Sequence, residues 1–444
     1  YSQFISSAEA EEDIEAFSRI LQVESSYFQI TDIDLAAHFG EAKSLCYKTD
    51  SVSIIELTYV FQWILGKIQD SHASVNYDDF DEEQYAWDRQ RFPFPIAPLD
   101  GQIAALSKIR ETKQYEYLHP EFPYLKAVNS LPIQQFFSEY GFDNTRFPEP
   151  ARTLRNTRDI RHIGEWYFRK GETLEGPLEI VLTNGSTDTT FLADTYPKNS
   201  TWYYPGDLRT LPLRRTMKKD EPFEYSQLIR TIDHEVEYLM IPSMIGYDEY
   251  PDFEPFFEAY LKAIDPTKSK GLIVDVRGNS GGSRDLIQTL SKFIVPKDQS
   301  PWVANVAYLR MDQQFDEDVP SMSGKQLFVY DSPHFTDEDR RAIDAFMKHF
   351  EPQAVYHPTA FSAPYCMVVQ HQEDLFLDLP IYILCDAGSF SAASILATVF
   401  KGLDNVTICG TTTNGSSGRS RYFYLPNSGI RIKLSTMLSF QRNG

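Results

Sequence analysis

Apolar side chains recur at helical spacing near the start of the chain. Between Glu11 and Leu21, and again between Ser53 and Ile68, they return every three or four residues, which places them on one face of a helix. Prolines at positions 93, 95 and 98 then interrupt the pattern. We therefore expect residues 1–80 to form an N-terminal helical domain.

The next part of the chain alternates short strand patterns with loops. Leu178–Leu182 and Thr190–Ala193 read as strands, and the Asn-Gly pair between them is a hairpin signal. The short strands and loops include Tyr124–Ile133, which precedes a helical pattern over Gln134–Tyr140, and the segment from Tyr140 to Trp166 reads as an insertion. We expect a mostly β domain with an insertion over residues 93–215.

Strands and helices alternate from about residue 225 onward. The apolar strand pattern Gly271–Val274 precedes an amphipathic helix over Leu286–Ile294, and Tyr382–Leu384 precedes another helix and the strand Val406–Cys409. This alternation is typical of a layered α/β domain, which we expect over residues 225–444. With 444 residues and 42% hydrophobic content, the chain can bury two or three cores.

The charge balance excludes several classes of partner. The chain carries 42 Lys and Arg against 63 Asp and Glu, a net charge of −21, which repels nucleic acid and anionic membranes. Its apolar runs are far shorter than a membrane span requires, so we expect no nucleic-acid partner and no membrane span within the given residues. The 9 histidines show no metal-ligand spacing, and we expect no metal and no cofactor. The oligomeric state and the redox state of the 4 cysteines stay open.

The stretch from Cys385 to Gly415 is the most informative part of the chain for chemistry. A strand runs into a tight Ala-Gly-Ser turn, and a helix opens at once with Ser391 and Ala392. Backbone N–H groups and the helix dipole converge at such a helix start and favour a developing oxyanion or alkoxide. The alternative is that Ser389 or Ser391 only caps the helix, because serine is a preferred cap residue.

A glycine-rich turn, DVRGNSGG, occupies Asp275–Gly282 between a strand and an amphipathic helix. A glycine pair at such a turn lets the backbone approach a ligand closely with its N–H groups exposed. Phosphate binding is a rival interpretation, but neither of the usual phosphate-binding glycine patterns is present.

Together these segments resemble the C-terminal processing (tail-specific) serine peptidase family, including its tricorn-like branch. DVRGNSGG is similar to the family's D-[LV]-R-x-N-x-G-G turn, and GSFSAASILATVF to its S-A-S-x-x-x-[IL] segment, which places the nucleophile at Ser391 rather than Ser389. Gly410–Gly415 resembles the G-x-x-T-x-G loop, with Thr413 as a supporting residue. Ile68–Val75 resembles the D-x-H-[TA] signature of branches that use a histidine base.

The chain departs from the family at one catalytic position. Many members use a serine/lysine dyad, but Ser416 stands at the lysine position, and Arg419, the nearest cation, cannot act as a base. The resemblance therefore implies His72 as the general base, preceded by Ser71 as in the tricorn-like branch. We expect activity to fall as the pH drops through the reference histidine pKa of about 6.5. That branch orients the histidine with a distant glutamate, which we expect beyond Gly444.

The resemblance implies a serine endopeptidase that cleaves unstructured or C-terminal segments of polypeptides through an acyl-enzyme. Ser391 would attack the peptide carbonyl, and the amides of Gly281 or Gly282 and of Ala392 would hold the oxyanion. The implied fold is a ClpP/crotonase-like layered β-α core with a PDZ-like middle domain. The active site would lie in a cleft between the helical and α/β domains, and the enzyme would be exported to a periplasm or the cell exterior.

Two other classes of function fit parts of the pattern. One is an inactive family member that binds peptides or apolar ligands, because the interphotoreceptor retinoid-binding proteins share this fold and are not known for proteolysis. Against this function, Ser391, His72 and the glycine pair are all present. A crotonase-like acyl-CoA enzyme would share the β-α core but would not explain the Asp-Ser-His match. Labelling with a fluorophosphonate probe discriminates among these functions.

Overall fold

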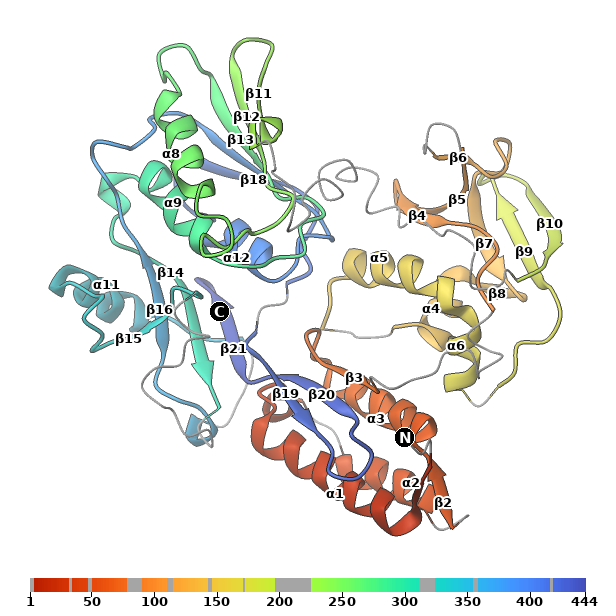
Figure 1. Cartoon of the computed structure of the whole chain (residues 1–444). Helices are drawn as coiled ribbons and strands as arrows, with labels where there is room; N and C mark the ends of the chain where they lie inside the picture. The colour runs from red at the N-terminus through yellow and green to blue at the C-terminus, as the bar shows by residue number, and fades with distance from the viewer. Residues whose placement is uncertain are drawn as a thin grey trace. The chain divides into compact units, whose positions relative to one another are not determined.

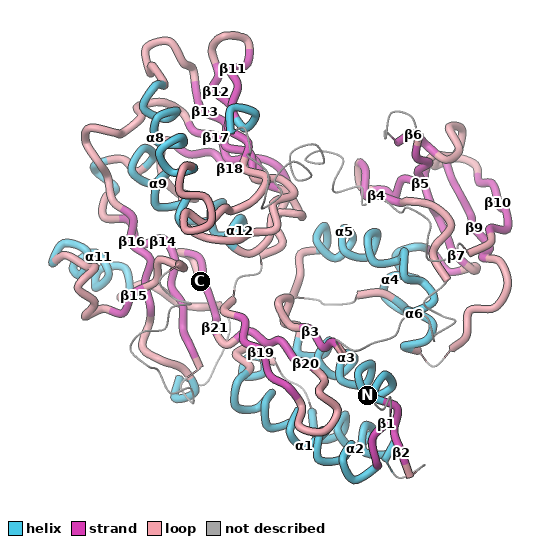
Figure 2. Tube along the Cα trace, viewed as in Figure 1, coloured by secondary structure: helices cyan, strands magenta, loops and turns pink. Residues whose placement is uncertain are grey.

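The computed structural model describes residues 4–31, 34–46, 50–77, 90–109, 115–142, 146–170, 172–195, 225–310, 324–353, 358–415 and 418–444. The chain folds into two compact units (Figures 1 and 2). One unit consists of Tyr1–Asp78 together with Leu213–Gly444, and the other of Asp79–Pro212. The N-terminal helical region therefore shares a unit with the α/β region.

Three helices form the N-terminal region: α1 (Ser7–Glu24), α2 (Leu35–Cys46) and α3 (Ile54–Ile68), of which α1 and α3 carry the two predicted apolar faces. The first begins where Ser6 and Glu9 form a reciprocal capping box. Their buried face packs against a sheet formed by β3 (Ser74–Asn76), β20 (Arg431–Ser435) and β19 (Ser420–Tyr424). This shared core brings the end of the chain beside the segment that follows α3.

A mostly parallel sheet forms the centre of the α/β region. Its strand order is β11 (Ile229–Ile232), β12 (Val236–Met240), β13 (Gly271–Asp275), β17 (Ile381–Cys385) and β18 (Val406–Gly410), and only β11 is antiparallel to its neighbour. The helices α8 (Phe253–Ala263), α9 (Asp285–Ile294) and α12 (Ala392–Val399) connect these strands and lie beside the sheet (Figure 1). Because β13 and β17 are parallel neighbours, the turns that follow them meet at one edge of the sheet.

A second, antiparallel sheet completes this region. Its order is β15 (Phe328–Val329), β16 (Tyr365–Val369), β14 (Trp302–Leu309) and β21 (Met437–Gln441), and α11 (Asp337–Met347) packs on it. Side chains of β14, α12 and β17 belong to one buried cluster, among them Ala307, Leu396 and Ile383. The helix α12 is therefore packed against both sheets, and the predicted α/β class holds as a mixed α/β fold with several sheets.

The second unit contains a sheet in the order β10 (Asp188–Ala193), β9 (Leu178–Thr183), β7 (Tyr124–Val128), β5 (Gln102–Lys108) and β4 (Ile96–Leu99). Short strands β6 (Tyr115–Tyr117) and β8 (Leu131–Pro132) pair with β5 and β7. The predicted hairpin joins β9 to β10. This unit also contains the helix α4 (Ile133–Tyr140), which matches the predicted helical pattern. The predicted insertion forms α5 (Glu149–Asp159) and the start of α6 (Ile163–Arg169), and its Trp166 is buried in the core of this unit.

Candidate active site

Ser391 lies between β17 and α12 in an unusual backbone conformation. Its φ of 54° and ψ of −122° are sparsely populated for a residue with a Cβ atom. Its side chain forms no capping hydrogen bond with the helix, although it occupies the N-cap position. Backbone strain of this kind persists only where the surroundings hold it, and it is typical of functional residues. The geometry therefore disfavours the simple cap that the sequence left open.

Ser389 has a different environment from Ser391. It is fully buried, its hydroxyl donates to the carbonyl of Val276 at 2.8 Å, and the same oxygen accepts the N–H of Asp386 at 3.1 Å. Both bonds lie inside the turns that follow β13 and β17. The hydroxyl of Ser389 is thus used to hold these two turns together.

The glycine-rich turn fixes the Ser391 turn through further hydrogen bonds. Asn279 accepts the N–H of Phe390 on its carbonyl at 2.9 Å, and its side chain bridges the carbonyl of Ile241 and the N–H of Gly281. The carboxylate of Asp386 accepts the N–H of Gly278 at 2.8 Å. Sequence reasoning missed Asn279 and Asp386 as positioning residues, although both stand inside the motifs that it quoted.

The two candidate oxyanion-hole glycines occupy positions that only glycine can take. A Cβ on Gly281 would lie 2.8 Å from the Cβ of Ser391, and one on Gly282 would lie 2.0 Å from the carbonyl oxygen of Met244. Both residues have positive φ, 93° and 142°. The N–H of Gly281 is already donated to Asn279. Within the described residues no acceptor faces the N–H of Gly282 or of Ala392, so of the two glycines the geometry favours Gly282 as a donor.

His72 meets Ser391 although 319 positions separate them in the chain. Its Nε2 lies 3.2 Å from the Oγ of Ser391, and its ring stacks on that of Phe390 with the centroids 4.6 Å apart. Both partners belong to the same compact unit, so the site does not lie between two separate units. The close approach of a serine hydroxyl and an imidazole is the arrangement that nucleophilic catalysis requires.

Asp70 holds the backbone of His72 in place. Its buried carboxylate accepts the N–H of His72 at 3.0 Å, and it also accepts the N–H and the hydroxyl of Ser435 at 2.7 and 2.8 Å. Burial raises the pKa of Asp70, and these hydrogen bonds oppose the rise. The carboxylate thus ties the histidine segment to β20.

The pKa of His72 is lowered to about 4, which differs from the reference value expected from the sequence. Burial of the ring is the largest cause, and the positive charges of Lys433 and Lys325 add to it. Lys325 donates from Nζ to the carbonyl of Gly418 at 2.9 Å, and burial lowers its own pKa to about 8. The Nδ1 of His72 is buried and has no hydrogen-bond partner among the described residues. The imidazole is therefore neutral, as a general base must be.

The remaining predicted residues lie in different settings. The hydroxyl of Ser71 is buried and has no partner within the described part of the chain. Thr413 is half-buried in the loop after β18, where the N–H of the neighbouring Asn414 donates to the carbonyl of Ser389 at 2.9 Å. Ser416 lies outside the described residues. No hydrogen bond connects Ser71 or Thr413 to Ser391 among the described residues.

Neither a metal-binding cluster nor a membrane-spanning helix occurs in the described residues. They contain no group of three or more His, Cys, Asp or Glu side chains placed to hold a metal ion. None of their helices has the length and apolarity needed to cross a membrane. Cys366, Cys385 and Cys409 are free thiols.

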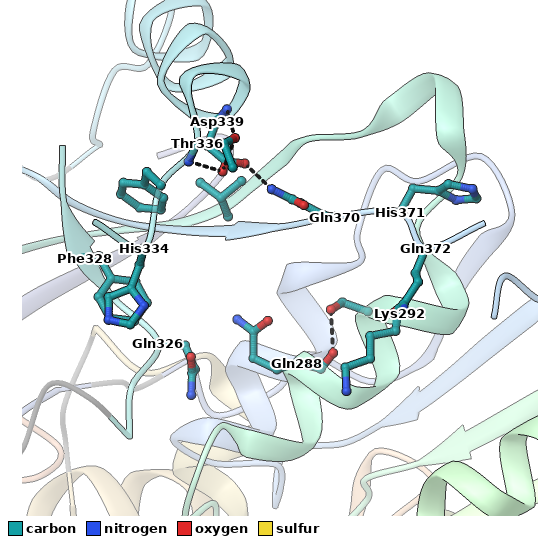
Figure 3. Close-up of a pocket in the computed structure, with 13 residues that line it drawn as sticks. Gln288, Lys292, Gln326, Phe328, His334, Thr336, Asp339, Gln370, His371 and Gln372 are labelled. Carbon is teal, nitrogen blue, oxygen red and sulfur yellow. Dashed lines mark hydrogen bonds between the residues drawn. The ribbon is translucent and has the colours of Figure 1, made fainter. Parts of the chain in front are cut away.

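A cavity of about 720 Å³ lies apart from Ser391 and His72, neither of which lines it. Figure 3 shows amide side chains of Gln288, Gln326 and Gln370 around it, together with Lys292 and Asp339. Its walls come from α9, β15, β16 and the start of α11. The reacting groups therefore do not lie in this cavity.

Comparisons with known proteins found one family model and several solved structures that match this chain. Residues 235–444 match the model of peptidase family S41. Mature CPAF is similar in structure, with a TM-score of 0.63 at 17% identity over 99% of this chain and 90% of that one. Mature CPAF complexed with lactacystin gives a TM-score of 0.61 at 16% identity over 99% and 91% of the two chains. At these identities the likeness shows the fold alone.

The photosystem II D1 C-terminal processing protease covers 98% of this chain and 89% of its own at 9% identity, but its TM-score of 0.43 is too low to support an argument. The comparison with curated proteins found no match. Residues 235–444 are thus similar to peptidase family S41, and the chain is a serine peptidase of the C-terminal processing type.

Proposed function

We propose that the chain is an endopeptidase in which Ser391 is the nucleophile and His72 the general base. It cleaves unstructured or C-terminal segments of polypeptides through an acyl-enzyme. The observation that carries this proposal is the 3.2 Å contact between the Nε2 of His72 and the Oγ of Ser391. A neutral imidazole at that distance can accept the hydroxyl proton as the oxygen attacks a peptide carbonyl.

The oxyanion forms beside two backbone donors in this mechanism. The donors in this proposal are the N–H of Ala392, which follows Ser391 at the start of α12, and that of Gly282, whose neighbour Gly281 would place a Cβ 2.8 Å from the Cβ of Ser391. The start of α12 adds the positive end of its helix dipole. Because the surrounding hydrogen bonds already fix both turns, these donors need no rearrangement when charge develops on the substrate oxygen. His72 then returns its proton to the leaving amine, and water releases the acyl group.

Lysine catalysis has no support in this arrangement. Lys325 is the buried lysine near the histidine, but its ammonium donates to the carbonyl of Gly418 rather than to Ser391. An orienting acid for the Nδ1 of His72, which the family resemblance leads us to propose, is not found among the described contacts of that atom. Asp70 contacts the main chain of His72 and acts on its position.

The other unit and the location of the enzyme belong to the same proposal. We propose that residues 93–215 form a PDZ-like domain that takes a peptide by strand addition, since β10 lies at one edge of the described sheet and exposes Leu192 by 69%. Family resemblance supports export to a periplasm or the cell exterior.

A fluorophosphonate probe tests the proposed function directly. The purified chain is treated with the probe, and the labelled peptide is identified by mass spectrometry while hydrolysis of an unstructured fluorogenic peptide is followed. We expect one label on Ser391 and loss of hydrolysis in proportion to labelling. A protein that binds peptides without labelling or hydrolysis would instead be an inactive member of the family.

A further inference from the structure

The sheet that carries the end of the chain has two unlike faces. Its inner face packs on the N-terminal helices. On its outer face Tyr422 stands opposite Lys433, and Tyr424 stands opposite Arg431. Because successive side chains of a strand point to opposite faces, these four residues share one face, which we call the docking face.

Aromatic and positive groups gather on the docking face. Tyr422 and Tyr424 are 56% and 63% exposed. The guanidinium of Arg431 lies 5.6 Å and the ammonium of Lys433 lies 6.0 Å from the centroid of the Tyr422 ring. No carboxylate of the described residues forms an ion pair with Lys433. Two cations therefore meet over one exposed ring in a chain whose net charge is −21.

One edge of this sheet is open in the described part of the chain. The strand order is β19-β20-β3, so β19 has a neighbour on one side only. Leu425 donates its N–H to the carbonyl of Ile430, which makes these opposed residues a hydrogen-bonded pair. Pairs alternate along an antiparallel ladder, so the N–H and C=O groups of Tyr422 and Tyr424 point away from β20 toward the open edge. An extended peptide can pair with such an edge.

This edge begins beside the proposed catalytic base. Ser420, the first residue of β19, pairs with Ser435. The N–H and hydroxyl of Ser435 donate to Asp70, which also accepts the N–H of His72. Gly418, two residues earlier, is so close that a Cβ on it would lie 3.8 Å from the Nδ1 of His72. Lys433 pairs with Ser74, two residues after His72. A peptide along β19 would thus have one end at the reacting groups.

We propose that the docking face and the open edge of β19 select the substrate of this site: an extended polypeptide segment that carries carboxylate side chains beside the scissile bond. The segment pairs with the backbone of Tyr422 and Tyr424, and its carboxylates meet Lys433 and Arg431. This inference rests on the proposed peptidase function. Charge complementarity carries the choice of ligand, because a positive face on an otherwise acidic chain attracts acidic segments and repels basic ones.

The test separates binding from catalysis by using the Ser391→Ala chain, which holds a peptide without cleaving it. Two fluorescent peptides of one unstructured sequence are compared, with either two Glu or two Gln at the centre, and Kd is read from anisotropy. We expect the Glu peptide to bind about fivefold more tightly at low salt, the scale of an exposed ion pair. The preference shrinks as the salt concentration rises to about 1 M.

Variants of the docking face locate the preference. Adding Lys433→Gln should bring the ratio of the two Kd values close to one, and Lys433→Glu should reverse it in favour of the Gln peptide. Lys268→Gln is the matched control, because Lys268 is an exposed lysine that pairs with Asp265 elsewhere on the unit. The control should keep the full preference.

Equal Kd values for the two peptides, or an unchanged preference in Lys433→Glu, would overturn the inference. The proposed catalytic function has a separate readout, since probe labelling and hydrolysis by the wild-type chain do not depend on this preference. A chain that cleaves both peptides equally well disproves the substrate class alone. If the Glu peptide binds more tightly but the probe never labels the wild-type chain, the docking face is supported and the proposed catalysis is disproved.

Discussion

The Ser391 turn and the His72 segment are held in place in two different ways. The serine turn is fixed by several hydrogen bonds to the adjacent glycine-rich turn. The N–H of Phe390 donates to the carbonyl of Asn279, and the carboxylate of Asp386 accepts the N–H groups of Gly278 and Gly388. The buried carboxylate of Asp70 connects the histidine segment to Ser435 near the other end of the chain, and β3, just after His72, pairs with β20 there. The nucleophile is therefore positioned by hydrogen bonds between two neighbouring turns of one sheet, and the base by contacts between segments near the two ends of the chain.

The largest expected effect comes from removing the proposed nucleophile. Ser391→Ala should lower kcat by roughly 10⁵- to 10⁶-fold and abolish probe labelling, because no other group can form the acyl-enzyme. Ser389→Ala is the matched control: it removes buried hydrogen bonds and should lower stability by about 1–3 kcal/mol while keeping the label. Peptide hydrolysis, labelling and thermal unfolding of both variants are compared. If Ser391→Ala were active and Ser389→Ala dead, the assignment of the nucleophile would be wrong.

Removing the base should have the next largest effect and also reports its pKa. His72→Ala should lower kcat/KM by several orders of magnitude, because Ser391 loses its proton acceptor. In the wild-type chain, burial and the nearby lysines disfavour the charged imidazolium, so the pKa is about 4 and the neutral base persists as the pH falls. Activity should then stay level from pH 7 to about 5 and be lost near pH 4.

The pH profile of kcat/KM, with circular dichroism at each pH to confirm folding, measures this limb. An inflection near pH 6.5 in a folded protein would mean that the imidazole has its reference pKa and that burial does not control it.

A substitution in the glycine-rich turn should disturb the turn that carries Ser391. Gly282→Val should lower kcat by about 10²-fold or more with a smaller change in KM, because a Cβ would collide with the carbonyl of Met244 and displace an oxyanion donor. Gly429→Val is a useful control, since Gly429 also has positive φ, 70°, but no atom lies within 4 Å of the added Cβ. Steady-state kinetics of the two variants test whether Gly282 is an oxyanion donor. A wild-type kcat in a folded Gly282→Val chain would contradict that role.

The smallest of these effects comes from the carboxylate of Asp70, which joins the histidine segment to β20. Asp70→Asn replaces an acceptor of the Ser435 N–H, so the histidine segment should lose part of its attachment to β20. We expect kcat to fall about tenfold to a hundredfold with little change in KM, the scale of a buried hydrogen bond to a charged group. If Asp70 positions the histidine, the variant has a lower kcat per active site at nearly unchanged KM. If the variant only folds less well, fewer active sites are present, but each is labelled by the probe at the wild-type rate.

Much of the secondary structure and the identity of the paired groups followed from the sequence. The strand-turn-helix units around Asp275–Gly282 and Cys385–Ala392 have strong local patterns, so the observed β13, β17 and α12 match the expected segments closely. The pairing of Ser391 with His72 came from motif resemblance. The lowered pKa of His72 could not be predicted, because it depends on burial and on Lys433 and Lys325, which are distant in the chain.

The sequence by itself determined the order of elements and the residue types at the reacting positions, since hydrophobic period and turn glycines act over a few neighbouring residues. Only the tertiary structure decided that the N–H of Gly281 is donated to Asn279, that the Ser389 hydroxyl forms buried hydrogen bonds, and that Asp70 joins the histidine segment to Ser435. These properties depend on contacts between residues up to 365 positions apart. Local sequence pattern does not encode such distances, because they are set when apolar faces pack into a common core.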